Sequence, residues 1–291
     1  MREVYARMAE LEREGRRFAV ATVVRTSGST PQVVGAKLLV DDLGRVVGTL
    51  GGGCVEGDAF TEAREVMATG RASLREYELT EELAWDTGLV CGGTMWIAIE
   101  PGERALQVAD RDLLGDVLAA SSGGRPVALG TLLRREGGAL VPAGRLFVEA
   151  DGGAHGSLGD PALDERAAAA ARDVLRGGTA KSVPLDEGRE LLVEPVLSRP
   201  RLIVAGGGHV GLALAKQGAL LDLDVTVIED RADFAARERF PDGVEVMHAD
   251  IVEALRTLWR WRNWRPIYSR DGQSSPPSSR RCQSSSKLAT P

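Results

Sequence analysis

Two cysteines of this chain are embedded in glycines, a setting in which a thiol can act on a bound ligand. Cys54 follows the triplet Gly51, Gly52 and Gly53, and Cys91 precedes two further glycines. Three glycines in a row cost backbone entropy, which indicates a positive φ or a close approach to the backbone. Unpaired N–H groups at a helix start favour a thiolate, so Cys54 is a candidate ligand-binding residue. The alternative is a tight strand-to-helix turn around a small buried cysteine.

A loop rich in hydroxyl groups is the second candidate. Ser27, Ser29 and Thr30 lie between the apolar segments 18–24 and 36–40, which have the pattern of buried strands. The next expected strand leads directly into the glycine triplet. Both loops therefore lie at strand ends, where functional residues are commonly found. Hydroxyl residues also occur in ordinary turns and helix caps, so this structural interpretation stays open.

The third candidate is a dinucleotide-binding fingerprint in the last third of the chain. An apolar strand, 201–205, is followed by glycines spaced as Gly-x-Gly-x-x-Gly and by a helical segment, which predicts a Rossmann unit. A second strand ends at Glu229, where an acidic residue can meet the ribose hydroxyls of a dinucleotide. The glycine turn supports the Rossmann fold more strongly than it supports cofactor binding, because a fold can retain such a turn for packing alone. The candidate cofactor-binding residues of this unit are Gly206, Gly208, His209, Gly211 and Glu229.

Periodicity and capping signals predict the elements that position these residues. Asp160 followed by Pro161 predicts a helix over 161–175, and Asp58 is expected to cap a helix over 58–68. The other expected helices are 1–17 and 112–120, and the other expected strands are 45–50, 73–79, 95–99, 126–133, 145–148, 191–196, 225–228 and 243–250. The predicted fold class is α/β, with a mixed α/β N-terminal domain (1–198) followed by a truncated Rossmann-like domain with a parallel sheet (199–258).

The chain from residue 259 onward departs from this pattern. Three of the five tryptophans lie within 259–264, and the segment 259–291 carries about +6, which leaves about −12 on the preceding residues. A doubly wound sheet needs further strands here, and none is indicated. We favour an out-of-frame or artificial segment that is disordered. The alternative is a functional basic and aromatic segment that contacts an acidic partner or a membrane surface.

Composition excludes several classes of function. The chain has 291 residues, 43% of them hydrophobic, and a net charge of −6, which fits a globular protein without general affinity for nucleic acid. Three widely spaced cysteines do not form a disulfide framework and fit the reducing cytoplasm. No apolar run reaches the ~20 residues of a membrane span. We expect no metal site, because His155 is the only histidine within 1–198 and zinc requires more ligands.

The motifs, taken in order, resemble the xanthine dehydrogenase accessory factor family (XdhC/CoxI). The similarity rests on the stretches 23–31, 35–37, 48–56 and 91–93 and on the glycine turn at 205–211. The resemblance implies a chaperone that binds the molybdenum cofactor (molybdopterin) transiently and supports its sulfuration with a cysteine desulfurase. It also implies delivery of the cofactor to an apo-molybdoenzyme of the xanthine dehydrogenase family. This is a binding role, so no catalytic residue is assigned.

Under this resemblance the candidate residues acquire specific roles. Glycine N–H groups and loop hydroxyls can hold a phosphate or a pterin, and a soft thiolate suits molybdenum or sulfur. The candidate cofactor-binding residues of the N-terminal domain are Ser27, Ser29, Thr30, Gly51, Gly52, Gly53, Cys54, Glu56 and Cys91. Two other functions stay open: an NAD(P)-dependent oxidoreductase that uses the Rossmann glycines, and a thiol enzyme in which Glu56 assists Cys54. A homodimer is a further expectation.

Overall fold

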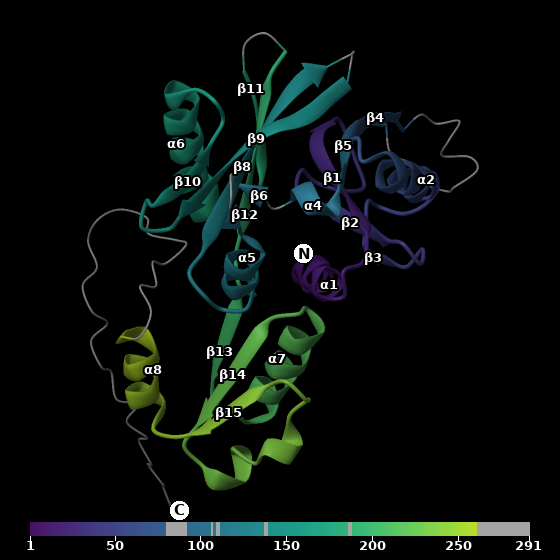
Figure 1. The fold of residues 1–291 in the computed structure, drawn as a ribbon. Helices are drawn as coiled ribbons and strands as arrows, with labels where there is room; N and C mark the ends of the chain where they lie inside the picture. Colours follow the sequence, from purple (N-terminus) through teal and green to yellow (C-terminus); the bar gives the residue numbers. More distant parts are fainter. Residues whose placement is uncertain (80–91, 106, 109–110, 137–138, 186–187, 261–291) are drawn as a thin grey trace, which may run out of the picture. The chain divides into compact units, whose positions relative to one another are not determined.

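The chain folds into two compact units, Met1–Pro200 and Arg201–Pro291. The computed structural model (Figure 1) describes residues 1–79, 92–105, 107–108, 111–136, 139–185 and 188–260. The first unit contains two five-stranded antiparallel sheets and a two-stranded one, and the second unit contains a parallel sheet, which confirms the predicted α/β class. The domain limits predicted at 198 and 258 remain predictions.

The first sheet of the N-terminal unit ends in two of the candidate loops. Its elements are β1 (Phe18–Ser27), β2 (Lys37–Asp41), β3 (Val46–Gly48), β4 (Ser73–Glu78) and β5 (Thr94–Pro101), and helix α2 (Cys54–Thr69) packs on it. The strand order is β3-β2-β1-β5-β4, with antiparallel neighbours. Ala19, Ala21 and Val23 alternate along β1 and are buried with Ala59 and Ala63 of α2. This period of two gives one face of the sheet to the helix.

The second sheet repeats this arrangement with another helix. Its elements are β8 (Val127–Glu136), β9 (Ala139–Glu149), β10 (Ala154–Ser157), β11 (Lys181–Pro184) and β12 (Glu190–Val196), and helix α6 (Pro161–Gly177) packs on it. The order is β10-β9-β8-β12-β11, again antiparallel. The predicted cap of α6 is confirmed, because the Ala162 N–H donates to Asp160 Oδ1 at 2.8 Å. Such a bond satisfies one of the free N–H groups of the first turn.

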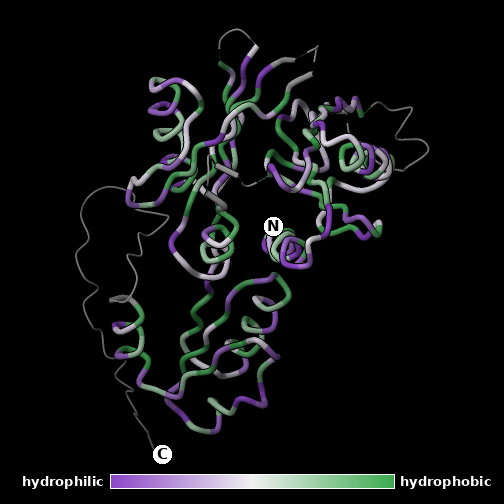
Figure 2. Tube along the Cα trace, in the orientation of Figure 1, coloured by the Kyte–Doolittle hydropathy of each residue, from purple (hydrophilic) through white to green (hydrophobic). Residues whose placement is uncertain are grey.

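The two sheets face each other, with α2 and α6 on their outer faces (Figure 1). Helices α1 (Arg2–Arg13) and α5 (Leu114–Ser121) contribute apolar side chains to the core between the sheets. This core joins Val20 of β1 to Leu129 and Phe147 of the second sheet. The short elements α4 (Gly102–Ala105), β6 (Gln107–Val108) and β7 (Arg111–Asp112) lie between β5 and α5 in the chain. Hydrophobic residues concentrate along many of these strands (Figure 2).

The second unit is a β-α-β unit followed by a third parallel strand. It contains β13 (Arg201–Ala205), α7 (His209–Leu220), β14 (Asp224–Glu229), two 3-10 turns (Ala232–Phe234 and Arg237–Arg239), β15 (Glu245–His248) and α8 (Ile251–Arg260). The strand order is β13-β14-β15, all parallel. Its core combines Ala215 of α7 with Val204, Val225 and Val227 of the sheet. The strand–glycine turn–helix pattern thus forms the predicted Rossmann-type unit. Nearly all of the segment 259–291, residues 261–291, lies outside the described residues.

One helix boundary differs from the prediction in a way that matters for the site. Helix α2 begins at Cys54, not at Asp58, so Asp58 is not its N-cap. The carboxylate of Asp58 instead accepts a hydrogen bond from the Tyr77 hydroxyl at 2.8 Å. The edge strands β10 and β11 were not predicted, because each has only four residues and little apolar alternation. No helix in the described part of the chain is both long and apolar enough to span a bilayer.

Candidate functional site

The hydroxyl loop and both glycine segments meet at one end of the first sheet. A Cβ atom at Gly51 would lie 2.6 Å from Pro31 Cβ, and a Cβ atom at Gly93 would lie 2.5 Å from the carbonyl oxygens of Ser27 and Ser29. Such distances are shorter than any real contact, so the chain approaches here as closely as glycine allows. The structure therefore brings the loop 27–31 together with the segments 51–53 and 92–93. We call this group of loops the loop site.

The glycine triplet has a backbone conformation that other residues rarely adopt. Gly51, Gly52 and Gly53 have φ values of +107°, +84° and +66°. A Cβ atom at Gly52 would meet no atom within 4 Å, so the backbone there borders open space. The triplet passes directly into α2, and no side chain caps that helix start. The first turn of α2 therefore leaves backbone N–H groups without an intrahelical acceptor.

Glu56 fixes the shape of this turn from inside α2. Its Oε1 accepts hydrogen bonds from the Thr49 hydroxyl at 2.6 Å, the Leu50 N–H at 2.9 Å and the Gly52 N–H at 3.0 Å. Burial raises the pKa of the Glu56 carboxyl, but these hydrogen bonds outweigh burial and the net pKa is lowered. The carboxylate is thus a structural anchor of the turn. Its predicted direct contact with a cofactor remains a prediction.

Cys54 is the first residue of α2, and its thiol is free and exposed. The alternative interpretation of a buried, small apolar cysteine is therefore wrong for Cys54. The thiol lies directly beside the glycine triplet and beside the free N–H groups of the helix start. It can reach a ligand that is bound at the loop site. Cys91 lies outside the described residues, although Gly92 and Gly93, which follow it, are part of the loop site.

The three hydroxyl residues of the loop differ in the hydrogen bonds that they make within the protein. The Thr30 hydroxyl donates to the carbonyl oxygen of Gln32 at 2.8 Å, so its proton is used within the loop. Ser27 and Ser29 are exposed, and their hydroxyls make no hydrogen bond within the described part of the chain. These two hydroxyls can therefore donate to an acceptor atom of a ligand. Their role in binding remains a prediction.

The glycine turn of the second unit is a separate candidate. Gly206 has φ +103°, and a Cβ atom at Gly211 would lie 1.8 Å from the Gly206 carbonyl oxygen. The third glycine of the fingerprint therefore allows close packing between helix and strand, as the motif requires. Gly208 precedes α7, and His209 is the exposed first residue of that helix. The turn is built as a Rossmann turn, and the cofactor contacts of these residues remain predictions.

Glu229 is buried at the end of β14 and is bonded within the protein. Its Oε2 accepts from the Gly207 N–H at 2.6 Å, and Arg231 donates its backbone N–H and its guanidinium to the same carboxylate. The hydrogen bond from the Arg231 side chain is the largest cause that holds the pKa of Glu229 far below its usual value. The carboxylate faces the glycine turn and Arg231, not the solvent. The ribose contact predicted for Glu229 would require it to leave these partners.

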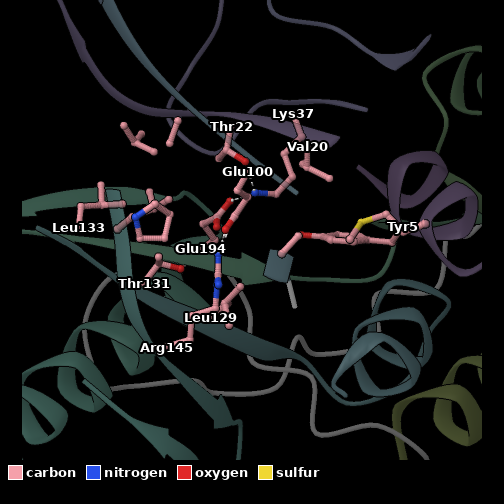
Figure 3. Close-up of a pocket in the computed structure, with 16 residues that line it drawn as sticks. Tyr5, Val20, Thr22, Lys37, Glu100, Leu129, Thr131, Leu133, Arg145 and Glu194 are labelled. Atoms are coloured by element: carbon pink, nitrogen blue, oxygen red, sulfur yellow. Dashed lines mark hydrogen bonds and ion pairs between the residues drawn. The ribbon is translucent and has the colours of Figure 1, made fainter. Parts of the chain in front are cut away.

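A pocket between the two sheets contains charged groups that the sequence analysis did not single out. Lys37 Nζ donates to Thr22 Oγ1 at 3.0 Å and lies 2.7 Å from Glu194 Oε1. Arg145 Nη2 lies 2.5 Å from both carboxylate oxygens of Glu100. Figure 3 shows Lys37 and Arg145 reaching the two carboxylates from opposite sides. Each cation has its own carboxylate, so these pairs link the sheets and are not the primary site for a charged ligand.

The sequence-based prediction did not include these ion pairs, because it treated charged residues inside apolar strands only as parts of the strands. A usable signal exists in the sequence, since Lys37 and Glu194 each interrupt a strand whose neighbours are apolar. Among the residues that the structure describes, no group of three or more His, Cys, Asp or Glu side chains is placed to hold a metal ion. The loop site is therefore the candidate that best combines an exposed thiol, free hydroxyls and open backbone.

Two family models match the chain. The model of the XdhC and CoxI family matches residues 11–78 and 120–186, and the model of the XdhC Rossmann domain matches residues 202–261. The first match includes the hydroxyl loop, the glycine triplet and Cys54. The second includes the glycine turn and Glu229.

Individual proteins of related description are also similar to this chain. A probable xanthine dehydrogenase subunit of Bacillus subtilis is 24% identical over 79% of this chain and 64% of its own length. The molybdenum cofactor insertion chaperone PaoD of Escherichia coli is 36% identical over 29% of this chain and 26% of its own length. The chain thus spans less than two thirds of the length of these relatives.

A solved structure shares the fold. It is described as a xanthine dehydrogenase from Bacillus halodurans, and it matches with a TM-score of 0.64 and 21% identity over 87% of this chain and 70% of its own. Two family models in the expected order, together with this likeness of fold, account for both units. The chain belongs to the XdhC and CoxI family.

Proposed function

We propose that this chain is an accessory protein that binds the molybdenum cofactor and passes it to an apo-molybdoenzyme of the xanthine dehydrogenase type. The observation that carries the proposal is the loop site, where an exposed cysteine, exposed hydroxyls and a turn of three glycines with positive φ meet. The names of two relatives point in the same direction, since one is a cofactor insertion chaperone and another belongs to a probable xanthine dehydrogenase.

The donor set of the loop site fits this cofactor. Cys54 offers a soft, exposed sulfur, which suits molybdenum or a sulfur atom better than a hydroxyl does. The open space at Gly52 lets a flat ligand approach the backbone, and the free N–H groups at the start of α2 favour an anionic group. The cofactor supplies the molybdenum and the redox chemistry when it is bound. The residues of this chain hold and orient it, and Glu56 keeps the turn in shape.

Sulfuration of the cofactor with a cysteine desulfurase is the finer part of the proposal. The exposed position of Cys54 supports it, because a partner that carries sulfur needs access to the bound cofactor. An exposed free thiol also fits a reducing compartment, so we include a cytoplasmic location in the proposal. The proposal also includes a homodimer, which a measurement of the molar mass by light scattering tests.

An NAD(P)-dependent oxidoreductase is the second candidate function, and it has less support. The glycine turn of the second unit favours it, but Glu229 is bonded to Gly207 and Arg231. Calorimetric titration with NADH and NADPH tests this alternative directly. Saturable binding of either one would support it, and a lack of heat at millimolar concentrations would reject it.

The proposal is tested by loading the purified full chain with molybdopterin cofactor. Molybdenum content, pterin fluorescence and transfer to an apo-xanthine dehydrogenase are measured together. We expect stoichiometric retention of both components and faster activation of the apo-enzyme. A protein that retains neither molybdenum nor pterin would contradict the proposed function.

A further inference from the structure

Arg25 lies on β1 two residues before the hydroxyl loop, inside the stretch 23–31 but not among the candidate residues named for it. Its guanidinium carbon lies 3.8 Å from the centre of the Trp96 ring. Arg25 is paired with Trp96 in the β1–β5 ladder, and Ser27 is paired with Thr94. Residues two apart on a strand share a face. Arg25 and Ser27 therefore point to the same side, about 7 Å apart along the strand.

The guanidinium of Arg25 has no carboxylate or hydrogen-bond partner within the described part of the chain. The other cation of this sheet face, Lys37, is buried and paired with Glu194. Stacking on an indole uses only the flat face of a guanidinium, and the N–H groups on its edge stay free. Arg25 is half-buried, so its charge is partly desolvated and oriented, and no carboxylate of the described residues neutralises it. Such an arginine is suited to bind an anion.

The surroundings limit what that anion can be. Glu76 is the register partner of Trp96 on β4, and Glu78 is the partner of Thr94, so two exposed acids share this sheet face on the far side of Trp96. The negative charges of Glu76 and Glu78 disfavour nonspecific binding of anions to this face. A compact anion that also accepts a hydrogen bond from the Ser27 hydroxyl reaches Arg25 without crossing Trp96.

We propose that Arg25, held flat on Trp96, is the residue that binds the phosphate of the cofactor at the loop site. The proposal rests on the proposed function. Arg25 lies on the interlayer side of the first sheet, whereas α2, which begins with Cys54, covers the opposite side. The loop 27–31 separates the two. A ligand bound over this loop presents its phosphate to Arg25 and its soft atoms to Cys54.

The test uses the full chain and three variants, R25Q, R25K and R45Q. The dissociation constant for molybdopterin cofactor is measured by pterin fluorescence in chloride buffer and in inorganic phosphate buffer of equal ionic strength. Arg45 is the matched control, because it is exposed at the opposite end of the same sheet, in the turn between β2 and β3. Thermal unfolding and far-ultraviolet circular dichroism report whether each variant is folded.

We expect R25Q to bind the cofactor about 10- to 100-fold more weakly, which is the range of a lost charge-assisted contact. R25K should lose less, since it keeps the charge but not the planar fork. Inorganic phosphate should weaken binding by the original chain and by R45Q but not by R25Q. A folded R25Q with unchanged affinity, or one with the same phosphate sensitivity, overturns the assignment of Arg25 alone. Absence of cofactor binding by the original chain overturns the proposed function, and this assignment with it.

Discussion

The carboxylate of Glu56 accepts the backbone N–H of Gly52 at 3.0 Å, so the first turn of α2 holds the glycine triplet that precedes it. The same oxygen also accepts from Thr49 and Leu50. One side chain thus connects the end of β3, the turn and the helix that begins with Cys54. The position of the thiol depends on this connection.

Replacing Glu56 should loosen the turn without unfolding the protein. E56Q loses the charge of the acceptor and should lower the free energy of unfolding by about 1–2 kcal/mol, as expected for weakened hydrogen bonds to a charged group. The affinity of E56Q for the cofactor should also be lower than that of the original chain. E65Q is the matched control, because Glu65 is exposed on the same helix. Equal effects of E56Q and E65Q in urea unfolding would contradict the anchoring role.

The anchoring by Glu56 should also depend on pH. Its pKa is lower in the folded chain than the usual value near 4.5. The stabilisation is therefore complete above about pH 4.5 and is lost as the pH falls through the folded value. The difference in unfolding free energy between the original chain and E56Q should shrink from pH 6 toward pH 3. A difference that is constant over this range would argue against an ionised acceptor.

Three of the four glycines in α2 and the turn before it should respond differently to replacement by alanine. G51A combines a strained positive φ with a Cβ atom 2.6 Å from Pro31, and should cost about 2–4 kcal/mol. G52A has the positive φ but open space, and should cost about 1–2 kcal/mol. Gly57 lies inside the helix with nothing within 4 Å, so G57A should stabilise by about 0.5–1 kcal/mol. Unfolding in guanidinium chloride measures the three changes in stability. A different order of the three variants would contradict this description of the turn.

The ion pair Lys37–Glu194 should contribute to stability only as an intact pair. K37M leaves a buried, unpaired carboxylate and should cost about 3–5 kcal/mol. The double variant K37M/E194L should cost clearly less than the sum of its single variants. The exposed pair Arg125–Asp151 is the control, with an expected coupling below about 1 kcal/mol. Additive single effects at Lys37 and Glu194 would mean that the two residues do not interact.

The second unit allows a test of the close packing at its glycine turn. A Cβ atom at Gly211 would lie 1.8 Å from the Gly206 carbonyl oxygen, whereas one at Gly208 meets nothing closer than Arg231 at 4.0 Å. G211A should therefore disrupt this unit, which limited proteolysis detects, and G208A should leave it folded. Similar protease resistance of both variants would contradict the packing described for this turn.

The sequence predicted well where a local signal is strong. Asp160 and Pro161 define the start of α6, and alternation along β1 defines its buried face. It failed at α2, because Asp58 looks like a cap while the helix start is formed by Glu56 and the preceding glycines. The proximity of Gly51 to Pro31 and of Gly93 to Ser27 could not be read from the sequence, since it depends on strand order. The contact of Arg25 with Trp96 depends on strand order in the same way, whereas Lys37 and Glu194 do carry a sequence signal, since each interrupts an apolar strand.

The most direct test of the central claim is the affinity of the full chain for molybdopterin cofactor with and without the Cys54 thiol. Cys54 is exposed, so C54S should unfold at the same temperature as the original chain. The control is C282S, which replaces the cysteine of the segment 259–291, outside the candidate site. We predict that C54S binds at least about tenfold more weakly, a loss of about 1.4 kcal/mol, and that C282S binds normally. Equal affinity of all three proteins would contradict a cofactor site built around Cys54.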